Sequence, residues 1–102
     1  MSREIEIMDR RLRKFVKKVR VKNTLGLHTR PATAIVKMLQ NCKSDVLFTC
    51  KRETINAKSI LSILMLAARK NTIITINVEG EDAEQVLDKL VEAFENKFGE
   101  EN

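Results

Sequence analysis

The sequence predicts an α+β fold in which a four-stranded antiparallel sheet is covered on one face by three helices, in the order βαββαβα. Segments that alternate polar and apolar residues, typical of half-buried strands, take turns with segments whose apolar residues recur every three or four positions, as in amphipathic helices. Two adjacent strand segments are separated only by a turn, which indicates a hairpin. The length of 102 residues suits one domain.

The first strand and the first helix follow from periodicity. Residues 18–22 alternate polar and apolar side chains, which predicts a strand. A helix is expected over residues 29–41, because its apolar residues share one helical face. Pro31 would lie in the first turn of this helix, where its missing N–H costs little.

The middle of the chain predicts a hairpin and then a short helix. Residues 44–50 are rich in strand-forming side chains, and residues 53–56 supply a short partner strand across a two-residue turn. A short buried helix is expected over residues 60–68, with Ser59 as its N-cap and Asn71 as a residue able to adopt a left-handed cap at its end.

The last strand and the last helix carry the clearest patterns. Residues 72–78 predict a strand, and an amphipathic helix follows from Ala83 to a point near Phe98. Acidic residues, including Asp82, precede this helix, where their negative charge interacts favourably with the positive end of the helix dipole. Residues 100–102 are expected to form a solvated tail.

The basic charge of the chain is concentrated at its N-terminus. The first 22 residues hold nine basic and three acidic residues, whereas the remainder holds ten and eleven. We therefore expect residues 1–16 to form a basic extension, either solvated or a short helix, and residues 17–102 to form the domain. The short helix is suggested by the spacing of Ile5, Met8, Leu12 and Phe15. A nucleic-acid-binding role for the extension is an alternative, although it lacks interleaved aromatic residues.

Composition argues against several other classes of protein. No apolar run approaches the roughly 20 residues that a membrane span needs, and the N-terminus does not resemble a secretory signal. Cys42 and Cys50 lack a CxxC spacing and have one histidine in the chain to assist them, so neither a metal nor another cofactor is expected. We expect a cytoplasmic monomer with free thiols.

One heptapeptide holds the only histidine and the only proline of the chain. His28 lies between a predicted strand and a predicted helix, where free N–H groups and the helix dipole attract anions. Arg30 adds a guanidinium suited to phosphate, and Gly26 permits close backbone approach. This arrangement suggests a histidine that accepts a phosphoryl group, although an isolated histidine is more often a cap or a solvated side chain.

The same heptapeptide, Gly-Leu-His-Thr-Arg-Pro-Ala at residues 26–32, resembles the active-site motif of the HPr family. These proteins are the histidine phosphocarriers of the bacterial phosphoenolpyruvate-dependent sugar phosphotransferase system. Residues 57–61, Ala-Lys-Ser-Ile-Leu, are similar to the second signature of that family and lie at its spacing from the histidine. Residues 72–83 resemble its final strand-to-helix stretch, so the resemblance covers about residues 17–98.

The resemblance implies both a fold and a role. It implies an open-faced β-sandwich in which enzyme I, charged by phosphoenolpyruvate, phosphorylates His28 on Nδ1 and enzyme IIA domains receive the group. Such a chain is a relay with a phosphohistidine intermediate and not a turnover enzyme. Arg30 would steady the phosphate, while Ile60, Leu61 and Leu64 match the family's apolar docking surface. We expect Ile60 or Leu61 to be exposed.

Ser59 matches a serine that an ATP-dependent HPr kinase/phosphorylase modifies in many relatives. A phosphate there would place about two negative charges beside the docking surface and oppose enzyme I. An alternative to the phosphocarrier is therefore a regulatory HPr-like binding module controlled at Ser59, with little role in sugar transport. Ala67 and Asn71 depart from the family, since both stand where glycine is common.

Overall fold

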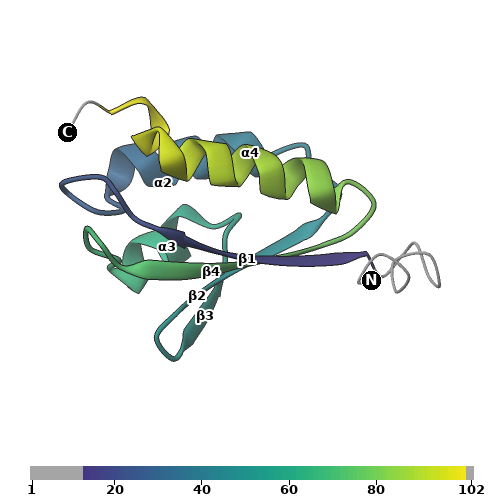
Figure 1. Cartoon of the computed structure of the whole chain (residues 1–102), viewed down its shortest axis with the longest axis horizontal. Helices are drawn as coiled ribbons and strands as arrows, with labels where there is room; N and C mark the ends of the chain where they lie inside the picture. The colour runs from purple at the N-terminus through teal and green to yellow at the C-terminus, as the bar shows by residue number, and fades with distance from the viewer. Residues whose placement is uncertain (1–12, 101–102) are drawn as a thin grey trace.

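The computed structural model describes residues 13–100 (Figure 1). It confirms the predicted α+β class and the predicted order of strands and helices. The strands are β1 (Lys14–Arg20), β2 (Asp45–Cys50), β3 (Glu53–Asn56) and β4 (Ile73–Glu79). The helices are α2 (Thr29–Leu39), α3 (Ile60–Leu66), α4 (Ala83–Glu95) and a 3-10 turn, η2 (Lys97–Gly99).

The sheet is antiparallel and has the strand order β1-β4-β2-β3. Because β4 lies between β1 and β2, the first and last strands of the chain are neighbours. Alternate residues of β4 point to the helical side, and Ile74, Ile76 and Val78 are fully buried there. The predicted hairpin of β2 and β3 is confirmed, with a positive φ of 60° at Lys51 in its turn.

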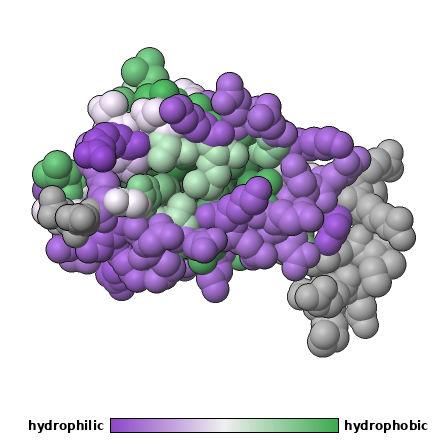
Figure 2. Space-filling model, turned by 90° about the horizontal axis from the view of Figure 1, so that it is seen from above, coloured by the Kyte–Doolittle hydropathy of each residue, from purple (hydrophilic) through white to green (hydrophobic). Residues whose placement is uncertain are grey.

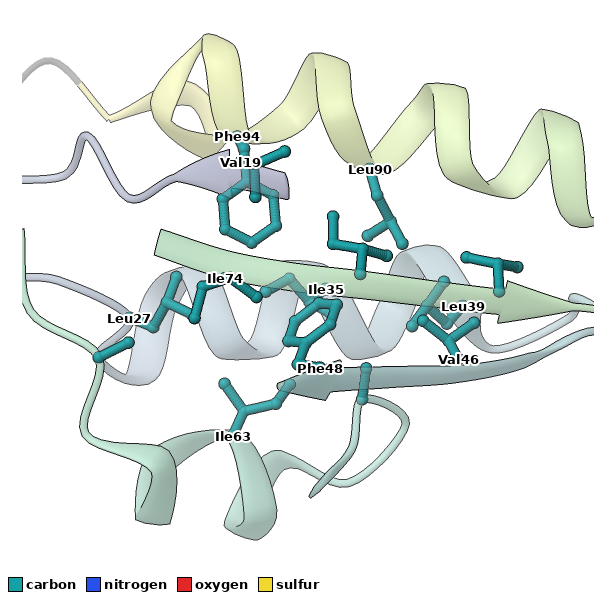
Figure 3. Packing of buried hydrophobic residues seen from close by; sticks show 14 of the residues in the cluster. Val19, Leu27, Ile35, Leu39, Val46, Phe48, Ile63, Ile74, Leu90 and Phe94 are labelled. Atoms are coloured by element: carbon teal, nitrogen blue, oxygen red, sulfur yellow. The ribbon is translucent and has the colours of Figure 1, made fainter. Parts of the chain in front are cut away.

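The hydrophobic core lies between the sheet and the helices (Figure 3). From α2, Ile35 and Leu39 are buried, and from α4 the ring of Phe94 meets Phe48 of β2 edge-on, with ring centroids 5.9 Å apart. Burial of one such side chain stabilises the fold by about 1.5–3 kcal/mol. The core therefore holds the start of α2, where His28 lies, at a defined position over the sheet.

The helical layer presents α2 and α4 side by side (Figure 1). Seen from above, apolar side chains show along its middle between hydrophilic margins (Figure 2). Ala34 and Met38 of α2 and Ala93 of α4 line a hollow between the two helices. Within residues 13–100, no helix has the length and the apolar character needed to cross a membrane.

The first strand begins earlier than the sequence predicts. It runs from Lys14 to Arg20, whereas the predicted strand covers residues 18–22 and the predicted domain begins at residue 17. The strand starts earlier because β4 extends to Glu79 and supplies backbone partners for the residues from Lys14 onward. Phe15 pairs with Val78, so it belongs to a strand and not to a short N-terminal helix. The other residues of that predicted helix lie outside the described part of the chain.

The short helix α3 ends earlier than predicted, and a different residue caps it. Ala67 adopts the left-handed conformation at φ 52° and ψ 41°, and its N–H donates to the carbonyl oxygen of Leu64. Asn71 also has a positive φ of 74°, but it lies in the turn before β4. The helix ends at Leu66 because the chain must turn there to bring Ala68, which is buried, into the core.

Replacing Ala67 with glycine is expected to stabilise the protein. An alanine in the left-handed region carries a steric cost of about 1–2 kcal/mol that glycine avoids. Glycine also raises the entropy of the unfolded chain, so we expect a net gain of about 0.5–1 kcal/mol. Chemical denaturation of Ala67→Gly against wild type measures it, and an unchanged or lower midpoint contradicts the prediction.

The last helix also ends before its predicted limit. After Glu95 the backbone enters the left-handed region at Lys97 and Phe98, with φ values of 58° and 54°. The ring of Phe98 packs edge-on against Phe94 at 4.9 Å between centroids. The turn sends Glu100 back toward the domain, so the prediction that this residue is part of a solvated tail is wrong.

Asp82 precedes α4 as predicted, but its carboxylate does not cap that helix. It accepts hydrogen bonds from the backbone N–H of Lys43, at 2.9 Å, and from the Ser44 hydroxyl, at 2.5 Å. These bonds, the first above all, hold the pKa of Asp82 below its usual value. Their contribution to stability is therefore present at neutral pH and is lost as the pH falls through that lowered pKa.

Candidate functional site

The loop between β1 and α2 is held tightly against the segment that follows α3. The N–H of Leu27 donates to the carbonyl oxygen of Ala68 at 2.9 Å, and Gly26 has a φ of +69°. A Cβ atom on Gly26 would overlap the backbone of Ala68 and Arg69. The glycine that sequence reasoning assigned to close backbone approach is therefore required here. This contact brings the start of α2 beside α3.

His28 occupies the N-cap position of α2 with an extended backbone, and its side chain does not cap the helix. Its carbonyl oxygen instead accepts the first helical hydrogen bond, from Ala32 at 3.0 Å. The imidazole is partly exposed, at 28% of its side-chain surface. It is therefore neither a capping side chain nor freely solvated.

The imidazole is bound by a carboxylate that the sequence did not reveal. Nε2 of His28 lies 2.9 Å from Oε2 and 3.2 Å from Oε1 of Glu100. Oε1 also accepts a hydrogen bond from Nδ2 of Asn23 at 2.5 Å, and that same nitrogen lies 2.9 Å from the carbonyl oxygen of Lys97. Asn23 is fully buried, so the site is tied to the framework of the domain.

Arg30 is exposed at the first turn of α2. Within residues 13–100 its guanidinium makes no hydrogen bond or ion pair, and the backbone N–H groups of Thr29 and Arg30 also have no partner there. Pro31 fills the third helical position and has no N–H to offer. Two backbone donors and one guanidinium are thus available to an anion near His28.

A hollow at the start of α2 is lined by both basic and acidic side chains. Its lining residues are Thr29, Arg30, Thr33, Ala34, Lys37, Phe98 and Glu100. An anion in the hollow would meet the charges of Arg30 and Lys37, while the carboxylate of Glu100 is engaged with the imidazole. The hollow therefore offers two cationic side chains to an anion at the start of α2, while His28 is not among its lining residues.

Ser59 occupies the N-cap of α3, as predicted. Its hydroxyl accepts a hydrogen bond from the N–H of Ser62 at 3.2 Å, and its side chain is partly exposed. A helix of seven residues contributes little dipole, so the hydrogen bond is the main structural role of this serine.

The outer side of α3 is apolar and exposed. Leu61 and Met65 expose 69% and 75% of their surfaces, Ile60 exposes 38%, and Leu64 is half-buried. The expected exposure of Ile60 or Leu61 is confirmed for both. Leu25, in the loop held against the end of α3, is also 73% exposed. Exposed apolar groups this close together are typical of a protein-docking surface.

Sequence reasoning missed Asn23, Glu100, Leu25 and Met65. Glu100 lies 72 residues from His28 along the chain, and Asn23, although near His28, belongs to an irregular segment, so no local pattern marks either residue. Met65 could have been found, because it lies one helical turn after Leu61 on the outward face of α3. In residues 13–100 no three metal-ligating side chains converge, and Cys42 and Cys50 are free thiols.

Comparison with known proteins gives one consistent result. Residues 15–96 match the family model described as "PTS HPr component phosphorylation site". The chain is 42% identical over 80 residues to the phosphocarrier protein HPr of Chlamydia muridarum, covering 78% of this chain and 77% of that protein. It is 37% identical over 86 residues to the HPr of Treponema pallidum, with coverages of 84% and 98%.

Solved structures agree with these sequence relatives. An HPr from Thermoanaerobacter tengcongensis superimposes with a TM-score of 0.82 at 33% identity, covering 86% of this chain and 99% of that one. An HPr from Bacillus anthracis superimposes with a TM-score of 0.74 at 37% identity, with coverages of 79% and 95%. Both the sequence and the arrangement of elements are therefore similar to those of phosphocarrier proteins.

Proposed function

This chain belongs to the HPr family of phosphocarrier proteins, and on that premise we propose that Nδ1 of His28 accepts a phosphoryl group from phosphorylated enzyme I and passes it to enzyme IIA domains. The observation that supports this assignment is the site itself. One partly exposed imidazole lies at a helix start, two residues before Arg30, and within residues 13–100 the Arg30 guanidinium and the backbone N–H groups of Thr29 and Arg30 make no hydrogen bond. No metal or cofactor is needed for such a transfer.

The transfer is a displacement at phosphorus. The lone pair of Nδ1 forms the new phosphorus–nitrogen bond, while the bond from phosphorus to enzyme I breaks and its electron pair stays on the donor. Arg30 and the N–H groups of Thr29 and Arg30 stabilise the negative charge of the phosphoryl oxygens. In the second step the nitrogen–phosphorus bond breaks toward the acceptor on an enzyme IIA domain, and the imidazole recovers its lone pair.

The apolar surface on α3 supports the choice of a protein as donor and acceptor. Ile60, Leu61 and Leu64 lie on the helix that packs beside the start of α2, so a partner seated on them would reach the imidazole. Burial of the exposed part of such side chains yields about 25 cal/mol per Å² of apolar surface.

The direct test is incubation of the chain with enzyme I and phosphoenolpyruvate. We expect one phosphoryl group per chain, stable to base and labile to acid, as for a phosphorus–nitrogen bond. Addition of an enzyme IIA domain should then remove it. Failure to incorporate phosphate under conditions where a known HPr is fully charged contradicts the proposal.

We further propose that phosphorylation of Ser59 by an HPr kinase/phosphorylase controls access to this site. The observations that support it are the partial exposure of Ser59 and its place directly before the docking side chains Ile60 and Leu61. A phosphate there would place about two negative charges at the edge of an apolar contact. The family assignment does not favour the regulatory-only or the nucleic-acid-binding alternative.

Replacing Ser59 with aspartate is expected to raise the KM for enzyme I by about fivefold or more, because a charge is added to the contact. Stability should be retained, since aspartate is as good an N-cap as serine. Ser59→Ala is the matched control, expected to lose about 1 kcal/mol of stability while its KM is unchanged. Steady-state kinetics and thermal denaturation measure both effects. An equal KM for the two variants contradicts control by charge.

The place of action that fits this proposal is the cytoplasm. Phosphoenolpyruvate and enzyme I supply the phosphoryl group there, and the two cysteines are free thiols, as expected in a reducing compartment. We propose that the chain acts there as a monomer. Sedimentation of the purified protein at micromolar concentration tests the oligomeric state.

A further inference from the structure

We propose that Glu100 is a positioning residue that holds His28 in the tautomer with the proton on Nε2 and leaves the lone pair on Nδ1. The role given to Glu100 rests on the proposed phosphoryl transfer, whereas its contact with His28 does not depend on that transfer. Both carboxylate oxygens of Glu100 lie within hydrogen-bond distance of Nε2, at 2.9 and 3.2 Å. An ionised carboxylate has no proton to donate, so Nε2 must be the donor.

The other ring nitrogen is thereby prepared for reaction. A neutral imidazole carries one proton, and a proton on Nε2 leaves Nδ1 with its lone pair. Within residues 13–100 Nδ1 has no hydrogen-bond partner, so nothing competes for that lone pair. The two nitrogens point to different sides of the ring, which lets the carboxylate remain bound while phosphorus approaches Nδ1.

The carboxylate is held in place by the fold. Oε1 of Glu100 accepts a hydrogen bond from Nδ2 of Asn23 at 2.5 Å, and Asn23 is fully buried. The same Nδ2 donates to the carbonyl oxygen of Lys97 at 2.9 Å, and Phe98 packs on Phe94. The side chain of Glu100 is only 15% exposed. A side chain fixed in this way loses little further freedom when it orients the ring.

The charge of Glu100 also serves the transfer itself. When Nδ1 forms its bond to phosphorus, the ring gains positive charge while the proton on Nε2 stays in place. A carboxylate 2.9 Å away stabilises that charge, and the stabilisation ends when the phosphoryl group leaves and the ring is neutral again. Glu100 takes up no proton in either step.

The hydrogen-bond pattern makes Glu100→Gln a specific test of the tautomer of His28. Asn23 donates to Oε1 of Glu100, so the amide oxygen of glutamine would occupy that position and its NH2 group would replace Oε2, the atom nearest to His28. The NH2 group donates, and it would therefore pair with an unprotonated Nε2. The favoured tautomer should shift toward a proton on Nδ1, the atom that has to attack.

The test is nitrogen NMR of the imidazole at alkaline pH, where the ring carries one proton. The chain has one histidine, so its two ring nitrogens are assigned without ambiguity. In wild type we expect the shift of a protonated nitrogen at Nε2 and of an unprotonated one at Nδ1. In Glu100→Gln the populations should move toward the opposite tautomer. The kcat for phosphorylation by enzyme I should fall about tenfold or more with KM unchanged, because the docking surface is intact.

Glu95→Gln is the matched control. It removes a carboxylate from the same end of the domain, where Glu95 pairs with Lys22 at 2.6 Å, without touching the imidazole. It should change neither the tautomer nor kcat. A wild-type spectrum with the proton mainly on Nδ1, or identical tautomer populations in wild type and Glu100→Gln, overturns the inference. A wild type with the expected tautomer that enzyme I does not phosphorylate overturns the proposed function and leaves the tautomer result standing.

Discussion

The variant His28→Ala is expected to incorporate no phosphate from phosphoenolpyruvate and enzyme I. The chain has one histidine, so no second imidazole can substitute for the lost acceptor. The loss should be complete within detection, and we expect a rate at least about 10³-fold below that of wild type, because the nucleophile itself is removed. Quantitative phosphate analysis and the mass of the intact protein measure it.

Folding must be shown to survive in that variant. The imidazole is partly exposed and its main polar contact is with Glu100, so its loss should cost about 1–3 kcal/mol of stability and leave a cooperative unfolding transition. Ser59→Ala, which keeps the histidine, serves as the control and should be phosphorylated like wild type. Phosphate found on folded His28→Ala after treatment with enzyme I would disprove the assignment of the acceptor.

Gly26→Ala is expected to destabilise the domain by about 2–5 kcal/mol. Part of this cost is strain, about 1–2 kcal/mol for an alanine at a φ of +69°. The remainder is steric, because the new Cβ would overlap the backbone of Ala68 and Arg69 and force the two segments apart, at about 1–3 kcal/mol. Chemical denaturation measures the sum.

Gly99→Ala separates the two contributions. Gly99 has a φ of +83°, but a Cβ there would meet nothing within 4 Å, so only the strain applies. We expect it to be less destabilising than Gly26→Ala by the steric part. Separation of the loop from Ala68 should also slow phosphorylation of His28, since the imidazole follows that loop. Equal destabilisation by the two variants would show that the close approach at Gly26 is not what holds the loop.

The elements of the fold were predictable where periodicity is local. The alternation in β4 and the apolar face of α2 are properties of neighbouring residues, and both agree with the structure to within one or two residues. The ends of α3 and α4 were not predictable from pattern. Ala67 ends α3 in a conformation that disfavours alanine, because burial of Ala68 and the contact with Leu27 outweigh the local cost.

The residues of the candidate site also differ in how far they could be predicted from the sequence. His28, Arg30 and Pro31 are near neighbours in the chain, so their position at a helix start was predictable from the sequence, whereas their role toward phosphate stays a prediction. The docking residues Ile60, Leu61 and Leu64 came from the resemblance to the HPr family, and Met65 on the outward face of α3 was missed. The contact between Glu100 and His28 could not be predicted from the sequence. It depends on the left-handed backbone of Lys97 and Phe98, which no helix or turn motif in the sequence indicates.

The sequence by itself determined the fold class, the element order, the heptapeptide around His28 and the resemblance to phosphocarriers. Each of these depends on residues that are near neighbours in the chain. Only the tertiary structure decided that β4 lies between β1 and β2, that Gly26 meets Ala68, and that Glu100 returns to the imidazole. Such contacts depend on the packing of the whole core and on buried partners such as Asn23. Local pattern carries no information about which distant backbone or side chain will satisfy a buried polar group.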